Sequence, residues 1–322
     1  MGGPMHWLRL AWRLQRWEIA FVTLACLALG AFAGYLAFEM RSMLASCGGG
    51  SIGTIPCASP FVFQETHGAT VSMVVALSGV LPFAVGLVLG VPIVARELER
   101  RTASISWPLA GSRMRWLAWR TVPTLVIALV AVCVPALTVD QALRARWPQD
   151  DVGFLEYGMH GVPVVMRAAL ALVIGVALGA VIGRLLPALL VGAGLSVALA
   201  VGLNLAVALW VPAQELATTT EQELEETFDV NSRLGVRSVS SEYRWPDGTL
   251  ISDAEADAII GAAYEAAGVS EPDQATLPQL VIYEIPAHRY PDVVLRESLG
   301  LGVATLVLAG LAALVVHRRR PG

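Results

Sequence analysis

Long apolar runs separated by short polar segments dominate the pattern along this chain. A hydrocarbon core about 30 Å thick requires roughly 20 consecutive apolar residues in a helix, and six stretches of the sequence meet this requirement. They cover residues 19–38, 71–95, 121–139, 162–183, 185–211 and 298–316. Because backbone polar groups in lipid must be hydrogen-bonded within their own segment, each stretch is predicted to be a helix. The predicted fold class is an all-α polytopic membrane protein with six transmembrane helices.

Composition supports this class. Hydrophobic residues make up 56% of the chain and charged residues 15%, whereas a soluble domain carries about 25% charge. No small-residue cleavage site clearly follows the first run, so we interpret it as a retained span and not as a signal peptide.

One charge interrupts the apolar runs, because Arg167 lies within the fourth. A charged side chain facing lipid tails at mid-bilayer costs at least about 2.5 kcal/mol, so we predict that Arg167 faces protein, water or the outer interface. The runs are otherwise almost free of ionisable residues. This weighs against a transporter driven by a proton gradient and places the energy source outside the chain.

The positions of the arginines predict how the chain is oriented in the membrane. All 22 basic residues are arginine, and most lie in four segments that fall on one side of six spans. These residues are Arg9, Arg13, Arg16, Arg96, Arg100, Arg101, Arg113, Arg115, Arg120, Arg184, Arg318, Arg319 and Arg320. The positive-inside rule makes this side cytoplasmic, so we expect a plasma-membrane protein with both termini in the cytoplasm. Only three acidic residues, Glu18, Glu97 and Glu99, fall on the same side.

Residues 1–18 are predicted to form an interfacial amphipathic helix. Arg9, Arg13 and Arg16 recur at helical spacing, and tryptophan and leucine cover much of the remaining surface, as in helices that lie on a membrane. The alternative is a simple cytoplasmic extension of the first span. The transmembrane part then comprises residues 19–212, followed after the outer segment by a sixth span and basic tail at 293–322.

The first outer loop carries Cys47 and Cys57 in C-G-G-G-S-I-G-T-I-P-C. Two cysteines this close in an oxidising exterior favour a disulfide, and two unpaired thiols are the alternative. Cys26 and Cys133 lie within spans and are interpreted as small packing residues.

Residues 213–292 form a long outer segment with 16 acidic residues. The part 214–228 is acidic and helix-prone, 237–250 resembles a strand entering an Asp-Gly turn, and Ser252 with Glu255 forms a capping-box pattern that opens a helix to about Ala267. Residues 280–285 have the pattern of another strand. We predict a small mixed α/β extracellular domain between the fifth and sixth helices.

The inner segment between the second and third spans is short, charged and helix-forming up to Trp107-Pro108. We interpret it as a docking element for a cytoplasmic partner. The alternatives are a basic loop that only fixes topology, and local pairing of Glu97 and Glu99 with the neighbouring arginines.

Glycines four residues apart recur within the spans. They are the pairs Gly30 and Gly34, and Gly86 and Gly90, and the set of three Gly175, Gly179 and Gly183. This spacing allows helices to approach closely in lipid. It favours packing within the chain over a dimer contact.

The chain lacks the motifs of common enzymes and metal sites. Without lysine it cannot contain the G-x-x-x-x-G-K-[ST] phosphate loop. It has no nucleophile elbow and no metal-ligand spacing, and the alternating Asp253, Glu255 and Asp257 are interpreted as a solvated helix face. We therefore expect no catalytic residues, no metal and no cofactor bound by this chain.

Three segments resemble the type-2 ATP-binding-cassette (ABC-2) permeases found in GC-rich Gram-positive bacteria. They are A-R-E-L-E-R-R-T followed by W-P-L-A-G-S-R-M-R-W-L-A-W-R, then Y-G-M-H-G-V-P-V-V through G-R-L-L-P-A, and I-P-A-H-R-Y-P-D-V-V-L-R-E. The chain departs from the family pattern at Arg101, where glycine is usual, and at Arg120, where lysine is usual.

The resemblance implies the permease subunit of an ATP-driven exporter. It implies a homodimer served by two separate ATPase subunits, which would hold ATP and Mg²⁺. It also implies a cytoplasmic coupling helix over about 96–107. The residues assigned to it are Arg96, Glu97, Glu99, Arg100, Arg101 and Thr102. The uncharged second and fifth spans favour an amphipathic or apolar cargo such as a drug, peptide or lipid.

Two other classes remain open from the sequence. A non-transporting sensor or assembly subunit would bind a ligand or protein through the acidic outer domain. An intramembrane enzyme would need paired polar catalytic groups at membrane depth, which the sequence does not show.

Overall fold

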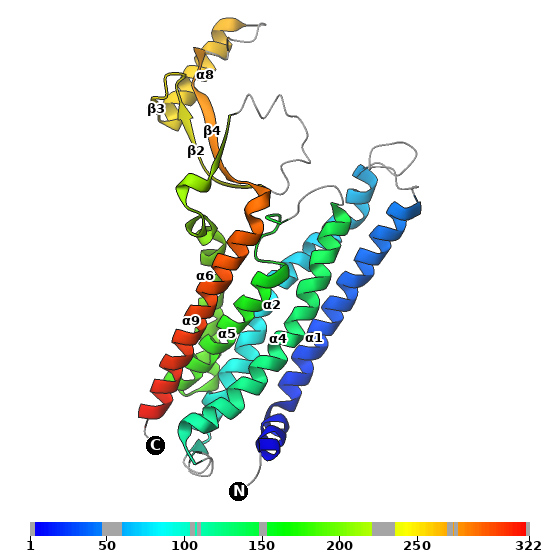
Figure 1. Cartoon of the computed structure of the whole chain (residues 1–322), viewed down its shortest axis with the longest axis vertical. Helices are drawn as coiled ribbons and strands as arrows, with labels where there is room; N and C mark the ends of the chain where they lie inside the picture. Colours follow the sequence, from blue (N-terminus) through cyan, green and yellow to red (C-terminus); the bar gives the residue numbers. More distant parts are fainter. Residues whose placement is uncertain are drawn as a thin grey trace. The chain divides into compact units, whose positions relative to one another are not determined.

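The structure is a computed structural model that describes residues 4–46, 60–103, 107, 111–147, 153–220, 236–268, 273 and 276–319. Within these ranges, six helices are long and apolar enough to cross a membrane, as predicted. They are α1 (Pro4–Ser46), α2 (Pro60–Glu99), α4 (Arg113–Arg146), α5 (Gly161–Ile182), α6 (Leu185–Leu205) and α9 (Tyr290–Arg318) (Figure 1). The chain is therefore a multi-pass membrane protein.

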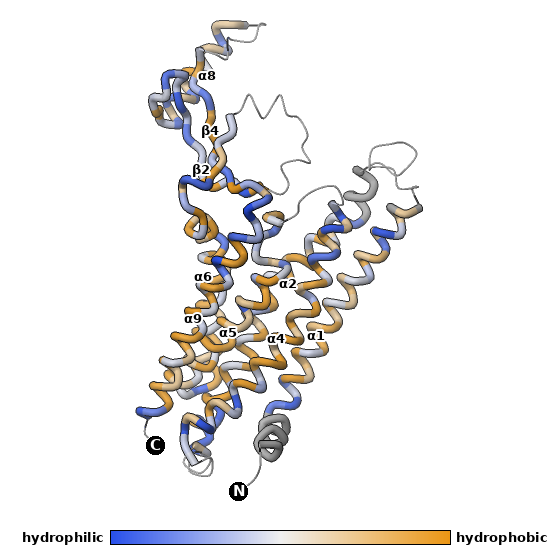
Figure 2. The backbone as a smooth tube through the Cα atoms, viewed as in Figure 1, coloured by the Kyte–Doolittle hydropathy of each residue, from blue (hydrophilic) through white to orange (hydrophobic). Residues whose placement is uncertain are grey.

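The apolar runs of the sequence form the middle of these helices, and polar residues gather toward their ends (Figure 2). The helix α1 continues without a break from Pro4 to Ser46, so the expected surface helix is continuous with the first span. Its position in the interface remains a prediction. Cys47 and Cys57 lie outside the described residues, whereas Cys26 and Cys133 are free thiols, the first of them buried.

Glycines allow α2 and α5 to cross in close contact. A Cβ atom on Gly86 would lie 2.5 Å from the Ala171 carbonyl carbon, and one on Gly179 would lie 2.6 Å from the Val91 carbonyl oxygen. A Cβ on Gly90 would overlap the carbonyl oxygen of Leu172. Two glycine pairs predicted from spacing therefore pack against each other within one chain, as expected for close helix contacts in lipid.

The helices α1 and α4 form a second close pair, where a Cβ on Gly30 would lie 2.7 Å from Cγ1 of Val134. The buried core joins α1, α2, α4 and α5, with Ala312 and Val316 of α9 at its edge. By contrast, α6 exposes most of its apolar side chains, and only Ala188 and Gly192 on it are buried.

A second compact unit comprises Gln149–Leu155 and Val207–Val293. It holds an antiparallel sheet of four strands in the order β1-β4-β2-β3. The strands are β1 (Ala217–Thr220), β2 (Arg237–Arg244), β3 (Leu250–Ile251) and β4 (Gln279–Ile285), and α8 spans Asp253–Ala267. The prediction of a small mixed α/β unit before the last span is confirmed.

Local signals predicted most of this unit. The Asp-Gly turn links β2 to β3, with Gly248 at φ 88°, and the Ser252 hydroxyl lies 2.7 Å from the Glu255 carboxylate at the start of α8. The helix predicted over 214–228 is wrong for residues 217–220, which form β1 because they pair with β4. This pairing partner lies far along the sequence, so local propensity does not reveal it.

Candidate functional site

The segment predicted to dock a cytoplasmic partner begins at the end of α2. The Thr102 amide donates to the Glu97 carbonyl oxygen at 3.0 Å, and the Arg101 amide donates to the Leu98 carbonyl oxygen at 3.2 Å. Arg101 has a φ of 56°. These two bonds and the left-handed residue form a Schellman motif, in which this position usually holds glycine.

This cap divides the segment expected to form one coupling helix over 96–107. Arg96, Glu97 and Glu99 belong to the last turn of the long helix α2, and residues 100–102 form the turn. Helical conformation recurs at Ala103 and Trp107. The predicted acids therefore lie at the end of a spanning helix, because the left-handed residue interrupts the helix directly after them.

Glu97 bonds to a residue of the third span. Its carboxylate lies 2.8 Å from the Arg120 guanidinium, with both side chains at most 15% exposed, and it accepts a hydrogen bond from the Thr102 hydroxyl at 2.7 Å. The pair therefore ties the end of α2 to α4.

Glu99 and Arg96 also bond within the chain. The Leu185 amide, at the start of α6, donates to the Glu99 carboxylate at 3.1 Å. The positive end of the helix dipole at this N-terminus stabilises the negative charge of Glu99. The Arg96 guanidinium lies 2.5 Å from the Glu18 carboxylate of α1. The acids Glu18, Glu97 and Glu99 thus link α2 to three other helices.

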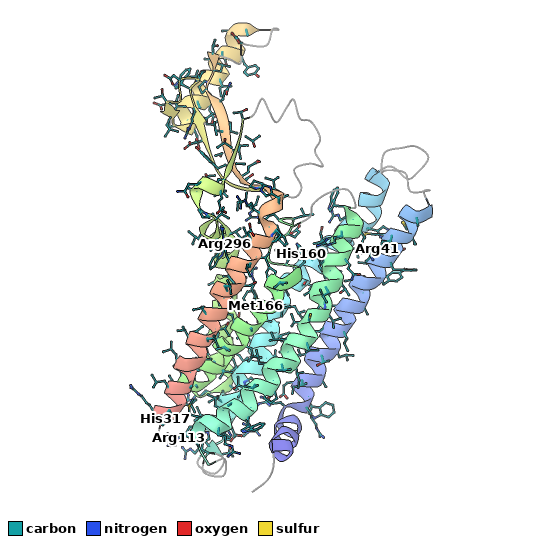
Figure 3. The ribbon with its side chains drawn as sticks, viewed as in Figure 1. Arg41, Arg113, His160, Met166, Arg296 and His317 are labelled. Atoms are coloured by element: carbon teal, nitrogen blue, oxygen red, sulfur yellow. The ribbon has the colours of Figure 1, made fainter. Side chains whose placement is uncertain are left out.

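Aromatic and arginine side chains complete this end of the bundle. The Trp107 and Trp116 rings meet edge to face at 5.9 Å, and the guanidinium of Arg113 lies 5.0 Å from the Trp107 ring. Arg113 also donates to the carbonyl oxygen of His317 at 2.8 Å, and Figure 3 shows these two residues together at one end of the helices. Arg319 donates to the Val181 carbonyl oxygen at 3.1 Å. The ends of α4, α5 and α9 are thereby held together.

A second polar site is buried between the helices, around Arg167 of α5. Nε and Nη2 of Arg167 donate to Oε1 of Glu297 in α9 at 3.2 and 3.0 Å, and Nη1 donates to the Gly158 carbonyl oxygen at 3.1 Å. The Tyr157 hydroxyl bonds to the other Glu297 oxygen. The side chains of Arg167 and Glu297 are 2% and 1% exposed. The prediction that Arg167 faces protein is confirmed.

Asp140 of α4 forms a neighbouring contact. Its Oδ1 lies 3.0 Å from Nδ1 of His160, which is buried, and its Oδ2 lies 2.9 Å from Nε of Arg144. His160 comes three residues after Tyr157, so one short loop before α5 supplies groups to both contacts. Through these contacts the loop is bonded to α4 at Asp140 and to α9 at Glu297.

Comparison with known families matches residues 20–211 to the model described as "ABC-2 membrane transporter related". The chain belongs to this family. The match covers the first five spans and more than half of the sequence. Searches of curated proteins and of solved structures give no match.

Members of the ABC-2 family are typically permeases without an ATPase domain, and they generally act with ATPase partner subunits. In this ABC-2 member, the residues assigned to the coupling helix lie in the last turn of α2 and in the turn that follows it: Arg96, Glu97, Glu99, Arg100, Arg101 and Thr102. The sequence did not reveal their partners Arg120, Leu185 and Glu18.

Glu297 is the functional-site residue that sequence reasoning missed. It lies just before the apolar run assigned to the sixth span, so it resembled an outer-loop acid. Two of the segments that resemble the permease family, Y-G-M-H and L-R-E, contain Tyr157 and Glu297, and the structure brings these residues into contact. The presence of Tyr157 and Glu297 in two such segments was the sequence signal that could have indicated this contact.

Proposed function

We propose that this chain is the membrane subunit of an ATP-driven exporter, working as a homodimer with two separate ATPase subunits. The observation that carries the proposal is the family match across five spans. The absence of lysine supports it, because the chain has no phosphate-loop lysine of its own. ATP and Mg²⁺ would then be bound by the partner subunit.

The proposal includes the orientation of the chain in the membrane. The arginine-rich end of the helices faces the cytoplasm, as the positive-inside rule requires, and the unit containing the sheet faces outward. ATP binding by the partner would push on the end of α2. Because Glu97 and Glu99 connect this end to α4 and α6, movement there would reach the spans directly.

The cargo we infer is amphipathic or apolar. The helix α6 contains no charged residue and leaves apolar side chains such as Leu190, Val197 and Leu205 exposed. A path between α2 and α6 of two subunits would offer an apolar surface. For ATP to drive movement, the inward- and outward-facing states must bind the cargo with different affinity.

The first test is complex formation. We would co-express the tagged chain with an ABC ATPase encoded beside its gene and purify the complex in mild detergent. We expect equal amounts of the two proteins, and nucleotide binding only when the ATPase is present. Purification of the chain alone, while the ATPase remains soluble and folded, would overturn the proposal.

A further inference from the structure

The short loop before α5, residues 156–160, bonds to three helices at once. The Tyr157 hydroxyl bonds to α9, the Gly158 carbonyl oxygen accepts a hydrogen bond from α5, and His160 bonds to α4. The side chains of Tyr157 and His160 are buried, and Figure 3 labels His160 well away from the end of the helices that carries Arg113. Loop 156–160 therefore lies packed among these helices.

The backbone of loop 156–160 is held in a costly conformation. Glu156 has a φ of 53°, and Gly158 has a φ of 78°. Glycine adopts such angles readily, but a residue with a side chain loses free energy there, and the conformation persists only where surrounding contacts fix it. The bonds of Tyr157 and His160 therefore hold the loop in a conformation that the backbone at Glu156 does not favour.

A buried hydroxyl without a partner lies beside this loop. Ser78 of α2 is fully buried, and its Oγ has no hydrogen-bond partner in the part of the chain that the structure describes. The next residue, Gly79, faces the loop, because a Cβ atom there would lie 2.9 Å from Cγ of Met159. An unpaired buried hydroxyl costs free energy, which would be recovered if the loop moved away and water reached Ser78.

We propose that loop 156–160 is a releasable closure, which leaves the helices when the bonds of Tyr157 and His160 break and then admits water to Ser78. The left-handed Glu156 and the unpaired Ser78 destabilise only the closed state, so they offset part of the stabilisation that the two bonds provide. Two states separated by such a small free-energy difference coexist, with the minor one at about 0.1–10%. The inference goes beyond the proposed function and concerns this chain without its ATPase.

The test measures how fast a water-soluble maleimide reaches the site that the loop covers. Ser78→Cys places a thiol there with little change in volume, and the full-length chain is labelled in lipid nanodiscs and analysed by mass spectrometry. Tyr157→Phe/His160→Leu removes both side-chain bonds and keeps the side chains bulky. We expect labelling of Ser78→Cys to become at least about tenfold faster with this double change, since each lost hydrogen bond shifts the equilibrium several-fold.

Two controls distinguish opening of the loop from general loosening of the fold. Tyr283→Phe, in the sheet, also removes a tyrosine hydroxyl that donates to a carboxylate, that of Glu242, at 2.6 Å. It should leave labelling of Ser78→Cys unchanged. Cys26 of α1 is fully buried as well, and its labelling rate should stay the same in every variant.

The outcomes are decisive in either direction. Faster labelling of Ser78→Cys, with no change at Cys26, supports a releasable loop. Equal labelling with and without the double change overturns the inference, and so does an equal acceleration at Cys26, because the bonds would then only stabilise the fold as a whole. If the double variant does not fold, Tyr157→Phe alone is judged by the same criteria, with a smaller expected acceleration. Because no ATPase is present, these results do not depend on the proposed function.

Discussion

Arg101 has a left-handed backbone at the position of a helix cap that glycine usually occupies. This conformation costs a residue with a side chain about 1–2 kcal/mol, partly offset by the roughly 0.5–1 kcal/mol that glycine loses in backbone freedom. Arg101→Gly should therefore raise the stability of the chain by up to about 1.5 kcal/mol. Thermal unfolding in detergent checks this.

The control for Arg101→Gly is Arg115→Gly, in the first turns of α4. There glycine should lower stability by up to about 1 kcal/mol, because the position is helical. A lower unfolding temperature for Arg101→Gly than for the unchanged chain would contradict the conformational explanation.

The Arg167–Glu297 pair makes a second prediction at this scale. Removing one partner of a buried ion pair leaves an uncompensated charge and costs about 3–5 kcal/mol. Arg167→Met and Glu297→Leu should each be strongly destabilising, and the double variant should be less destabilised than their sum. Additive effects in a double-mutant cycle would show that the two groups do not interact.

Glu242 of β2 makes stability depend on pH. Hydrogen bonds from Tyr283 and Arg244 lower the pKa of Glu242 below its ordinary value. The stabilisation is thus complete above the unfolded pKa, about 4.3, and disappears as pH falls through the lower folded pKa. Unfolding of the chain followed between pH 6 and pH 3 should show this loss, and Glu242→Gln should reduce it. Because the site is exposed, the effect will be small.

At the scale of elements, the crossing of α2 and α5 depends on glycine. Gly90→Ala should destabilise the chain by about 1–3 kcal/mol, since the new methyl group meets the Leu172 carbonyl and the helices must move apart. Gly310→Ala in α9 is the control, because no atom lies within 4 Å of its added Cβ. Equal stability of the two variants, measured in the same detergent, would show that this crossing does not require glycine.

Hydropathy predicted the six spanning helices because lipid forces every apolar run of sufficient length into a helix. Short-range signals likewise predicted β2, β4 and α8. The strand β1 was missed because its hydrogen bonds go to β4, which local sequence does not reveal. Local sequence likewise does not reveal the partners of the predicted site residues. Glu97 bonds to Arg120 in another helix, and Arg167 bonds to Glu297, which lies 130 residues away.

At the scale of the whole molecule, family membership and the contacts at the end of α2 support one account of function. The ABC-2 match covers residues 20–211, and within it the end of α2 bonds to α4 and α6 through two carboxylates. A partner that moves this end would act on several spans together. The apolar helices would then change their exposure to the cargo.

ATP-dependent transport tests this account most directly. The complex of this chain with its ATPase would be reconstituted in liposomes with ATP and Mg²⁺ outside, and movement of a fluorescent amphipathic dye and of a fluorescent phospholipid would be followed. The account predicts inward movement of at least one probe in vesicles with outward-facing ATPase. The movement should stop when the phosphate-loop lysine of the ATPase is replaced. Sustained ATP hydrolysis with no ATP-dependent movement of either probe, by a correctly oriented complex, would contradict the exporter assignment and favour a sensor.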